Sequence, residues 1–346
     1  MTPVDDFWLM KLMPFDFGQR AWFLTIGMSV YIVGLTVAAT SGWGAVYLGS
    51  PAFLLGAAGV GWVWATIGSR VKDAYTLYVD LGDVYETPVE DYEGFIAGEH
   101  RQILSWRNQA LISTPIASLF VVAGYVAFFR WPTSMFGERI QSIRPWPFME
   151  DVYVSPNVQA KYGVVTLFAL IIGISLGVTL WLMIRESVTI ARMGRFVPIP
   201  LPEVIRSRLE PLADFHTRFA SEWSVGVVLF LVMFWRTPDL ASVVLLAGLA
   251  IIGLAAFIIP QRLLSRLVRR SYERACVLTL RSYQDAHSSA AIPGAATGEL
   301  QLLASLRAAT APAKYSVYGF DELLRWMLSQ VVAFACVGIQ IALTAR

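Results

Sequence analysis

Seven long apolar stretches dominate this chain of 346 residues. A helix needs roughly 20 mostly apolar residues to cross the hydrocarbon core of a bilayer. Hydrophobic residues make up 56% of the sequence and charged residues 15%, whereas a soluble domain is usually about a quarter charged. The sequence therefore predicts one all-α, polytopic membrane domain over 1–346, with spans at about 21–40, 52–69, 109–129, 162–184, 218–235, 240–259 and 326–345.

The distribution of lysine and arginine predicts the orientation, because these residues favour the cytosolic side of a membrane. Most of the 27 basic residues fall before the first span and in three longer segments, 70–108, 185–217 and 261–325. With seven spans, this places the N-terminus in the cytosol and the C-terminus outside. If the last stretch does not cross, the C-terminus lies inside. The fifth stretch, 218–235, is the weakest span because its apolar part is short.

The three inner segments are predicted to form a cytosolic layer of helices, since each has an apolar face to bury. The first reads as helix, break, helix, with the break at ETPVEDYEG, and Pro202 suits the first turn of a helix in the second. Acidic residues recur between Asp73 and Glu99 without EF-hand spacing. They are predicted to form a solvated face that pairs with nearby arginines rather than a calcium site.

The spans carry few side chains that could perform chemistry. HExxH, P-loop and GxGxxG motifs and a serine–histidine–aspartate set on neighbouring elements are absent from the sequence. Glu222 is the one acid predicted within a span, where it would snorkel or pair with Arg218 one turn earlier. Two cysteines and three scattered histidines favour neither disulfides nor a metal or haem site. We therefore expect no enzyme activity, no cofactor and no metal, and no basic stripe suggests a nucleic-acid partner.

Two further patterns predict contact surfaces. Small residues at four-residue spacing predict close helix packing, within one chain or between chains, at Gly34, Ala38, Ala169, Gly173 and Gly177. A basic face on the helix expected at 261–281 predicts contact with anionic lipid or another subunit, or simply a positive-inside anchor. Its residues are Arg262, Arg266, Arg269 and Arg270.

The last apolar stretch carries a polar stripe. On a helical wheel, Ser329, Ala333, Cys336 and Gln340 fall within an arc of about 60°, with Thr344 close by. Such a stripe must face something other than lipid, because unsatisfied polar groups in hydrocarbon are costly. It would form either a seam between helices or the lining of a water-filled path.

The layout resembles that of the insect odorant and gustatory receptor channels and their wider superfamily. The shared features are seven spans, an internal N-terminus, a longer second outer loop, long cytosolic helices before the final span and an end at LTAR just after it. The resemblance implies that the last helix of each of four subunits lines a central cation pore and that the cytosolic layer holds the subunits together.

These observations favour an oligomeric membrane ion channel, with the stripe lining the pore. The alternative is a non-conducting scaffold subunit of a larger assembly, with the stripe as a subunit seam. A transporter is third, and an intramembrane enzyme is last, to be revived by a buried acid–base pair near Glu222. The expected partners are the bilayer, further copies of the chain and possible other membrane subunits. The expected location is the plasma membrane or the bacterial inner membrane.

Overall fold

The computed structural model describes residues 7–8, 19–42, 44–49, 51–130, 156–233 and 240–289, and single positions 331, 335 and 338. Of these described residues 91% are helical and none forms a strand, so the all-α prediction is confirmed for this part of the chain. The elements in order are α2 (Gln19–Thr40), α3 (Gly44–Gly49), α4 (Pro51–Val79), η2 (Gly82–Val84), α5 (Val89–Leu104), α6 (Trp106–Arg130), α8 (Pro156–Met193), α9 (Pro202–Met233) and α10 (Leu240–Ser289).

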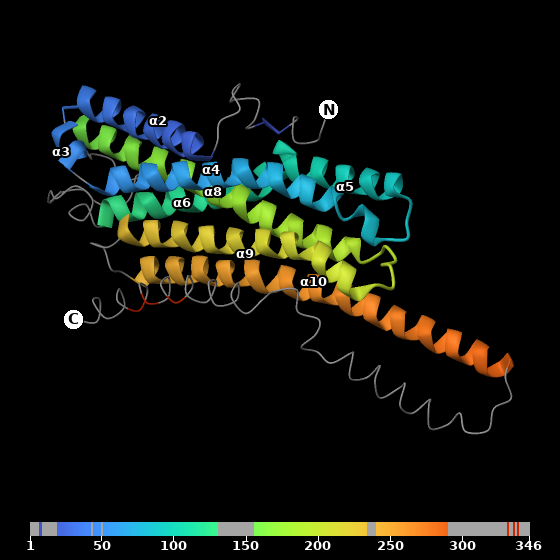
Figure 1. Ribbon diagram of the computed structural model, residues 1–346. Coiled ribbons are helices and arrows are strands. Elements are labelled where there is room, and N and C mark those ends of the chain that lie inside the picture. The colour runs from blue at the N-terminus through green and yellow to red at the C-terminus, as the bar shows by residue number, and fades with distance from the viewer. Residues whose placement is uncertain are drawn as a thin grey trace.

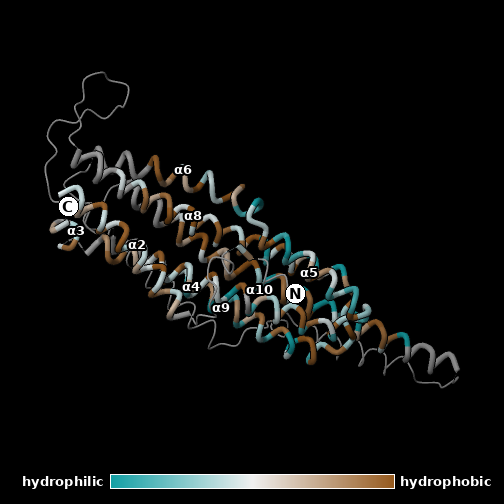
Figure 2. Tube along the Cα trace, turned by 90° about the horizontal axis from the view of Figure 1, so that it is seen from above, coloured by the Kyte–Doolittle hydropathy of each residue, from teal (hydrophilic) through white to brown (hydrophobic). Residues whose placement is uncertain are grey.

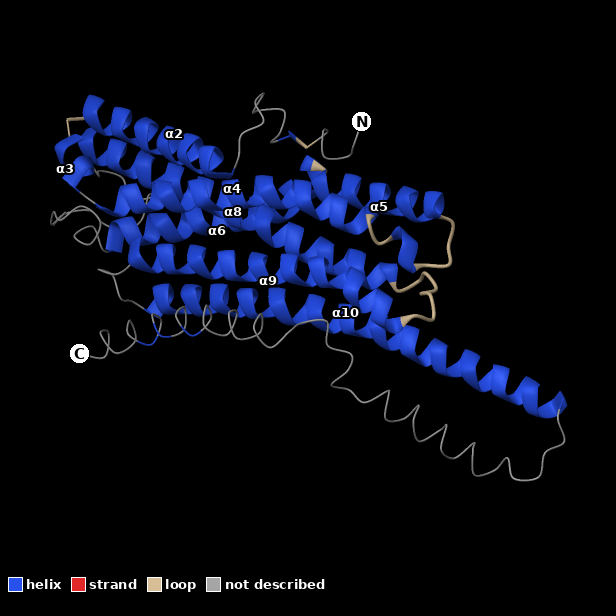
Figure 3. Cartoon of the chain, viewed as in Figure 1, coloured by secondary structure: helices blue, strands red, loops and turns tan. Residues whose placement is uncertain are grey.

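The long helices lie side by side in an elongated bundle (Figure 1). α2 packs on α4, α6 packs on α8, and α9 packs between α4 and α10. The connections from α4 to α5 and from α8 to α9 lie together at one end, beyond which the last part of α10 projects (Figure 3). We call this end, with residues 80–88 and 194–201, the loop end.

Four helices run on past their predicted spans without interruption. α4, α8 and α9 are 29, 38 and 32 residues long, and α10 reaches 50 residues through an internal proline, Pro260. α9 begins at Pro202, as predicted, because proline lacks the N–H that the first helical turn leaves unbonded. The predicted inner extensions are therefore continuous with the apolar parts of these helices.

Three helices in the described part are long and apolar enough to cross a membrane, at Ala21–Thr40, Thr166–Met193 and Ala247–Arg281. α2 also exposes a row of large apolar side chains: Leu24, Met28, Ile32, Val33 and Val37. Such a row suits contact with lipid, since soluble proteins rarely expose a large continuous apolar surface. Hydrophilic residues gather instead around α5 and the loop end (Figure 2). The architecture is consistent with that of a membrane protein.

Two clusters of buried side chains hold the bundle together. The first includes Trp64, Ile172 and Phe219 and joins α2, α4, α8, α9 and α10. The second includes Tyr92 and Leu209 and lies toward the loop end, where α5 joins α4, α8, α9 and α10. The loop end therefore has an apolar core of its own.

Backbone pairing fastens the two connections of the loop end to each other. The Glu86 N–H donates to the Val197 carbonyl at 3.0 Å, and the Ile199 N–H donates to the Val84 carbonyl at 3.0 Å. α10 joins them, because the Ser271 hydroxyl donates to the Ile199 carbonyl at 2.7 Å. This part of the chain is held as one unit by bonds between segments more than 70 residues apart.

Candidate functional site

A buried ion pair joins α4 to α9 at the inner ends of two predicted spans. Arg70 donates two hydrogen bonds to the Glu222 carboxylate, from Nε to Oε2 at 3.0 Å and from Nη2 to Oε1 at 2.6 Å. The two side chains are only 9% and 20% exposed. The guanidinium also lies over the ring of Phe215, 5.2 Å from its centroid. A two-point contact of this kind fixes both side chains in one geometry.

The predicted pairing of Glu222 with Arg218 was wrong. Arg218 instead pairs with Asp214, with 2.5 Å between Nη2 and Oδ2, and its side chain is 67% exposed. Arg218 and Glu222 are one turn apart on the same helix. Glu222 nevertheless pairs with Arg70 of α4, which is 152 positions away in the sequence. Local spacing alone could not reveal that partner.

A second acid–base pair lies beside the first. His216 Nδ1 and Glu186 Oε2 are 3.8 Å apart, and both side chains are almost fully buried. This exceeds hydrogen-bonding distance, and His216 Nε2 and Glu186 Oε2 have no hydrogen-bond partner. Burial, followed by the charge of Arg70, lowers the pKa of His216 to about 3. His216 is therefore neutral at physiological pH, and the pair is not a salt bridge.

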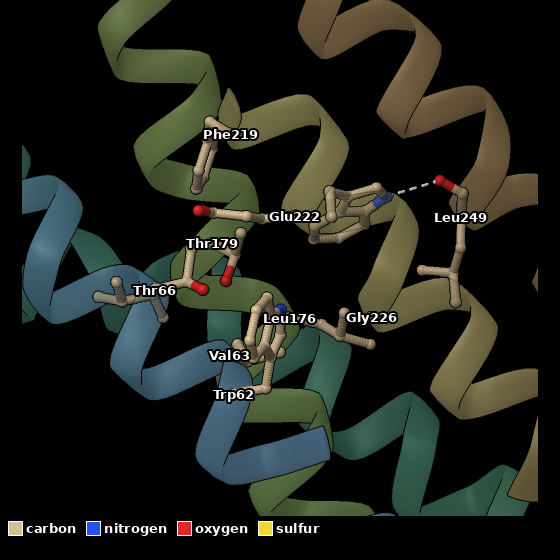
Figure 4. A pocket seen from close by; sticks show the side chains of 11 residues that line it. Trp62, Val63, Thr66, Leu176, Thr179, Phe219, Glu222, Gly226 and Leu249 are labelled. Atoms are coloured by element: carbon tan, nitrogen blue, oxygen red, sulfur yellow. Dashed lines mark hydrogen bonds between the residues drawn. The ribbon is translucent and has the colours of Figure 1, made fainter. Parts of the chain in front are cut away.

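A small cavity of about 20 Å³, with room for about one water molecule, lies next to the Arg70–Glu222 pair. Apolar side chains from α4, α8, α9 and α10 form most of its wall, among them Leu176, Phe219 and Leu249. Polar side chains converge on it from three helices, namely Thr66, Thr179 and Glu222 (Figure 4).

Two polar atoms at this cavity lack partners. The Trp62 indole N–H and the Thr66 hydroxyl are buried without a hydrogen bond. By contrast, the Thr179 hydroxyl donates to the Ser175 carbonyl at 2.8 Å, and the Trp223 indole donates to the Leu249 carbonyl at 2.8 Å. Buried polar groups in folded proteins are nearly always bonded, so these two atoms require an explanation.

The acidic segment between Asp73 and Glu99 pairs with arginines, but not only at the surface. Asp83 meets Arg208 at 2.8 Å with both side chains about half exposed. Glu99 is instead buried, and Arg185 and Arg192 reach its two oxygens at 2.9 and 2.6 Å. The solvated-face interpretation was therefore wrong for Glu99, which joins α5 to α8.

The small residues predicted for helix packing lie in close contacts within the chain. Gly34 and Ala38 are buried, and a Cβ at Gly34 would overlap the Tyr47 side chain. Ala169, Gly173 and Gly177 are also buried. A Cβ at Gly173 would lie 2.5 Å from Ala117 Cα, so α6 and α8 are in backbone contact there.

The predicted basic face of α10 is exposed at Arg262, Arg266, Arg269 and Arg270. Two of these side chains already have partners within the chain. Arg269 bonds Glu273 at 2.7 Å, and Arg270 donates to the Gly194 carbonyl of the loop end. Contact of this face with lipid or another subunit stays a prediction.

The predicted pore lining, Ser329, Ala333, Cys336, Gln340 and Thr344, lies outside the described residues. Val331, Ala335 and Gly338 are described as helical and exposed. Elsewhere in the described chain, no group of three or more His, Cys, Asp or Glu side chains could hold a metal ion.

His100 provides a test of the packing at the loop end. Its ring lies against Tyr75 and Tyr78, its Nδ1 is 3.2 Å from the Ile96 carbonyl, and its Nε2 has no partner. Burial is the main cause that lowers its pKa to about 4. In the unfolded state the histidine pKa is about 6.5. As the pH falls, His100 is therefore protonated in the unfolded state at a higher pH than in the folded state.

The stability contribution of His100 is thus complete above pH 6.5 and is lost as the pH falls toward 4. Between pH 7 and 5 the wild type should lose about 2 kcal/mol more unfolding free energy than His100→Phe, which keeps the ring contacts but cannot titrate. Denaturant unfolding in detergent at both pH values measures this difference. Equal losses in the two proteins would contradict the assignment.

No family model, no curated protein and no solved structure matches this chain.

Proposed function

We propose that this chain is a homo-oligomeric membrane scaffold that crosses the bilayer seven times, with its N-terminus and its loop end in the cytosol. The three apolar helices and the lipid-suited face of α2 support the membrane part. The excess of basic residues in the inner segments supports the orientation. The scaffold was the second candidate from sequence, after an oligomeric ion channel.

The observation that carries the proposal is a set of three exposed apolar side chains at the loop end. Val197, Leu201 and Val204 are 47%, 54% and 42% exposed and lie within eight residues of one another. The polar end of the bundle is the part that would meet water, so lipid does not cover this surface. Exposed apolar patches rimmed by polar residues mark protein interfaces. We call Val197, Leu201 and Val204 the loop-end surface.

The charges around the loop-end surface suit a second copy of the same chain. Charged residues of both signs lie beside it in the chain, at Arg195, Glu203, Arg206, Arg208 and Glu210, although Glu203 accepts a hydrogen bond from Tyr272 and Arg208 pairs with Asp83. In a two-fold dimer the same surface of both copies is in contact. Charges of both signs on that surface can therefore pair with their opposites on the other copy. The support beneath it is rigid, because the second cluster and the paired connections hold it.

The final stretch fits the scaffold as a helix seam. Val331, Ala335 and Gly338 are helical and exposed, and the Ser329–Gln340 stripe itself lies outside the described residues. In α8, the comparable stripe at Gly173 and Gly177 packs a neighbouring helix rather than lining a path. The same device in the last stretch would satisfy its polar groups against another helix.

The test of the scaffold is Leu201→Asp, which places a carboxylate at the proposed interface. We expect self-association to weaken by about 100-fold, since each two-fold contact then carries two unpaired buried charges. Light scattering behind size-exclusion chromatography in detergent gives the oligomeric mass. Ser207→Asp, exposed on α9 six residues further along the chain, adds a charge without removing apolar surface and should retain the wild-type mass. A wild-type mass for Leu201→Asp would contradict the proposal.

An oligomeric ion channel is the second candidate, and the polar stripe from Ser329 to Thr344 favours it. In the superfamily that the layout resembles, the last helix lines a central pore. Sustained ion flux through wild-type protein in liposomes would favour this candidate over the scaffold. The buried Glu186–His216 pair is the observation that would return attention to an intramembrane enzyme.

A further inference from the structure

Glu186 of α8 is an acid in the interior of the bundle whose carboxyl group is only partly satisfied. Its side chain is 6% exposed, and its Oε2 atom is buried without a hydrogen bond. The His216 Nδ1 atom of α9 lies 3.8 Å from Oε2, which is too far for a hydrogen bond. An ionised carboxylate in this position would lose its hydration with little return, and a buried acid in such surroundings keeps its proton instead.

His216 brings no positive charge to this acid. Its side chain is 3% exposed, and burial is the main cause that lowers its pKa to about 3, so the imidazole is neutral at physiological pH. The ring packs edge-on against Phe215, with 5.2 Å between the ring centroids. The surroundings on the α9 side therefore favour the neutral form of the Glu186 carboxyl group.

The arginines around this acid are already bonded to other carboxylates. Arg70 of α4 donates two hydrogen bonds to Glu222. On α8 itself, Arg185 and Arg192 reach the two oxygens of Glu99 at 2.9 and 2.6 Å. None of these three guanidinium groups is free to serve a further carboxylate.

Other charged groups on the neighbouring helices lie at the surface or are neutral. Arg218 of α9 is 67% exposed and pairs with Asp214, and the basic face of α10 is exposed. On α5, burial lowers the pKa of His100 to about 4, so this ring is also neutral. Arg70 is the described cation whose charge acts on Glu186. One guanidinium therefore stands between two carboxyl groups and is bonded to only one of them.

We propose that Glu186 is a proton-binding site, a neutral carboxylic acid at physiological pH whose proton sits on Oε2 and faces His216 Nδ1. An approach of about 1 Å would let the Oε2–H group donate to Nδ1. Loss of the proton leaves two carboxylates beside one guanidinium, so Arg70 is then shared between Glu186 and Glu222. The proton thereby links the contacts among α4, α8 and α9 to pH. The inference does not depend on the scaffold proposal, since the site lies in the core of the bundle.

Infrared spectroscopy of the full chain in nanodiscs, with and without carbon-13 glutamate, tests the protonation directly. At pH 7 the wild type should show the C=O band of a protonated glutamic acid, and Glu186→Gln should lack it. Glu222→Gln frees Arg70 to hold Glu186 as a carboxylate, so the acid band should disappear there as well. Glu273→Gln, which alters an exposed acid paired with Arg269, should keep the band. No acid band in the wild type, or a band that persists in Glu186→Gln or Glu222→Gln, overturns the proposal.

Unfolding in denaturant gives a second test that does not depend on spectral assignment. A glutamate in the unfolded chain has a pKa of about 4.3, so at pH 6–7 folding takes up one proton at Glu186. Relative to Glu186→Gln, the unfolding constant of the wild type should therefore rise about tenfold from pH 6 to pH 7. The ratio of the wild type to Glu273→Gln should stay constant over this range. A constant ratio of the wild type to Glu186→Gln would show that the site carries no proton.

Discussion

Replacing Gly177 by alanine is expected to cost about 3 kcal/mol of stability, at the upper end of the usual effect of overpacking. A Cβ at this position would overlap Ser113 Cα and lie 2.7 Å from Ser113 Cβ. The obstructing atoms belong to the backbone and first side-chain carbon of α6, so no rotamer change relieves the clash. The two helices must separate along a seam that continues at Gly173 and Ala117.

Gly163→Ala provides the matched control within the same helix. A Cβ at Gly163 meets no atom within 4 Å, so alanine should be neutral or stabilise the helix by up to about 1 kcal/mol. Unfolding in a detergent titration measures both variants. The double variant Gly173→Ala/Gly177→Ala should lose less than the sum of the single losses, because the first substitution already parts the helices. Equal stability of Gly177→Ala and Gly163→Ala would contradict the seam.

Removal of Arg70 should destabilise the protein by about 3–4 kcal/mol, because it leaves the Glu222 carboxylate without its partner in a largely buried site. Arg70→Met keeps much of the apolar length of the side chain and removes only the charge. Glu222→Leu should have a similar cost by leaving the Arg70 guanidinium unpaired. The double variant Arg70→Met/Glu222→Leu should recover most of the loss, since it leaves no uncompensated charge.

The exposed pair Arg218–Asp214 is the control for this cycle. Its partners are 67% and 37% exposed and one turn apart, so its double-mutant coupling should be about 0.5 kcal/mol or less. Denaturant midpoints of the four proteins in each cycle supply the coupling energies. A coupling at Arg70–Glu222 no larger than this value would show that the pair does not hold α4 against α9.

Features that repeat along one helix were accessible from the sequence. The long apolar stretches predicted the helices, Pro202 predicted a helix start, and the spacing of Gly173 and Gly177 singled out a close face. These signals are local, because helical periodicity and proline geometry act within a few residues.

Features that depend on tertiary contact were not accessible. Arg70 and Glu222 are 152 positions apart, and no feature of the sequence around Arg70 marks it as the partner of Glu222. Glu99 belonged to a run of acids, and nothing in that run distinguishes it as the one that two arginines bury. The cavity arises where four helices meet and has no signature in any one of them. One signal in the sequence could have suggested the Arg70–Glu222 pair. Arg70 stands at the end of one predicted span, and Glu222 is an acid inside another.

The most direct test of the scaffold account counts subunits in a membrane. Fluorescently labelled wild-type protein is reconstituted in liposomes at falling protein-to-lipid ratios, and photobleaching steps are counted for each complex. The account predicts two or more steps that persist on dilution, and single steps for Leu201→Asp under the same conditions. Single steps for the wild type at every protein density would contradict self-association and with it the proposed function.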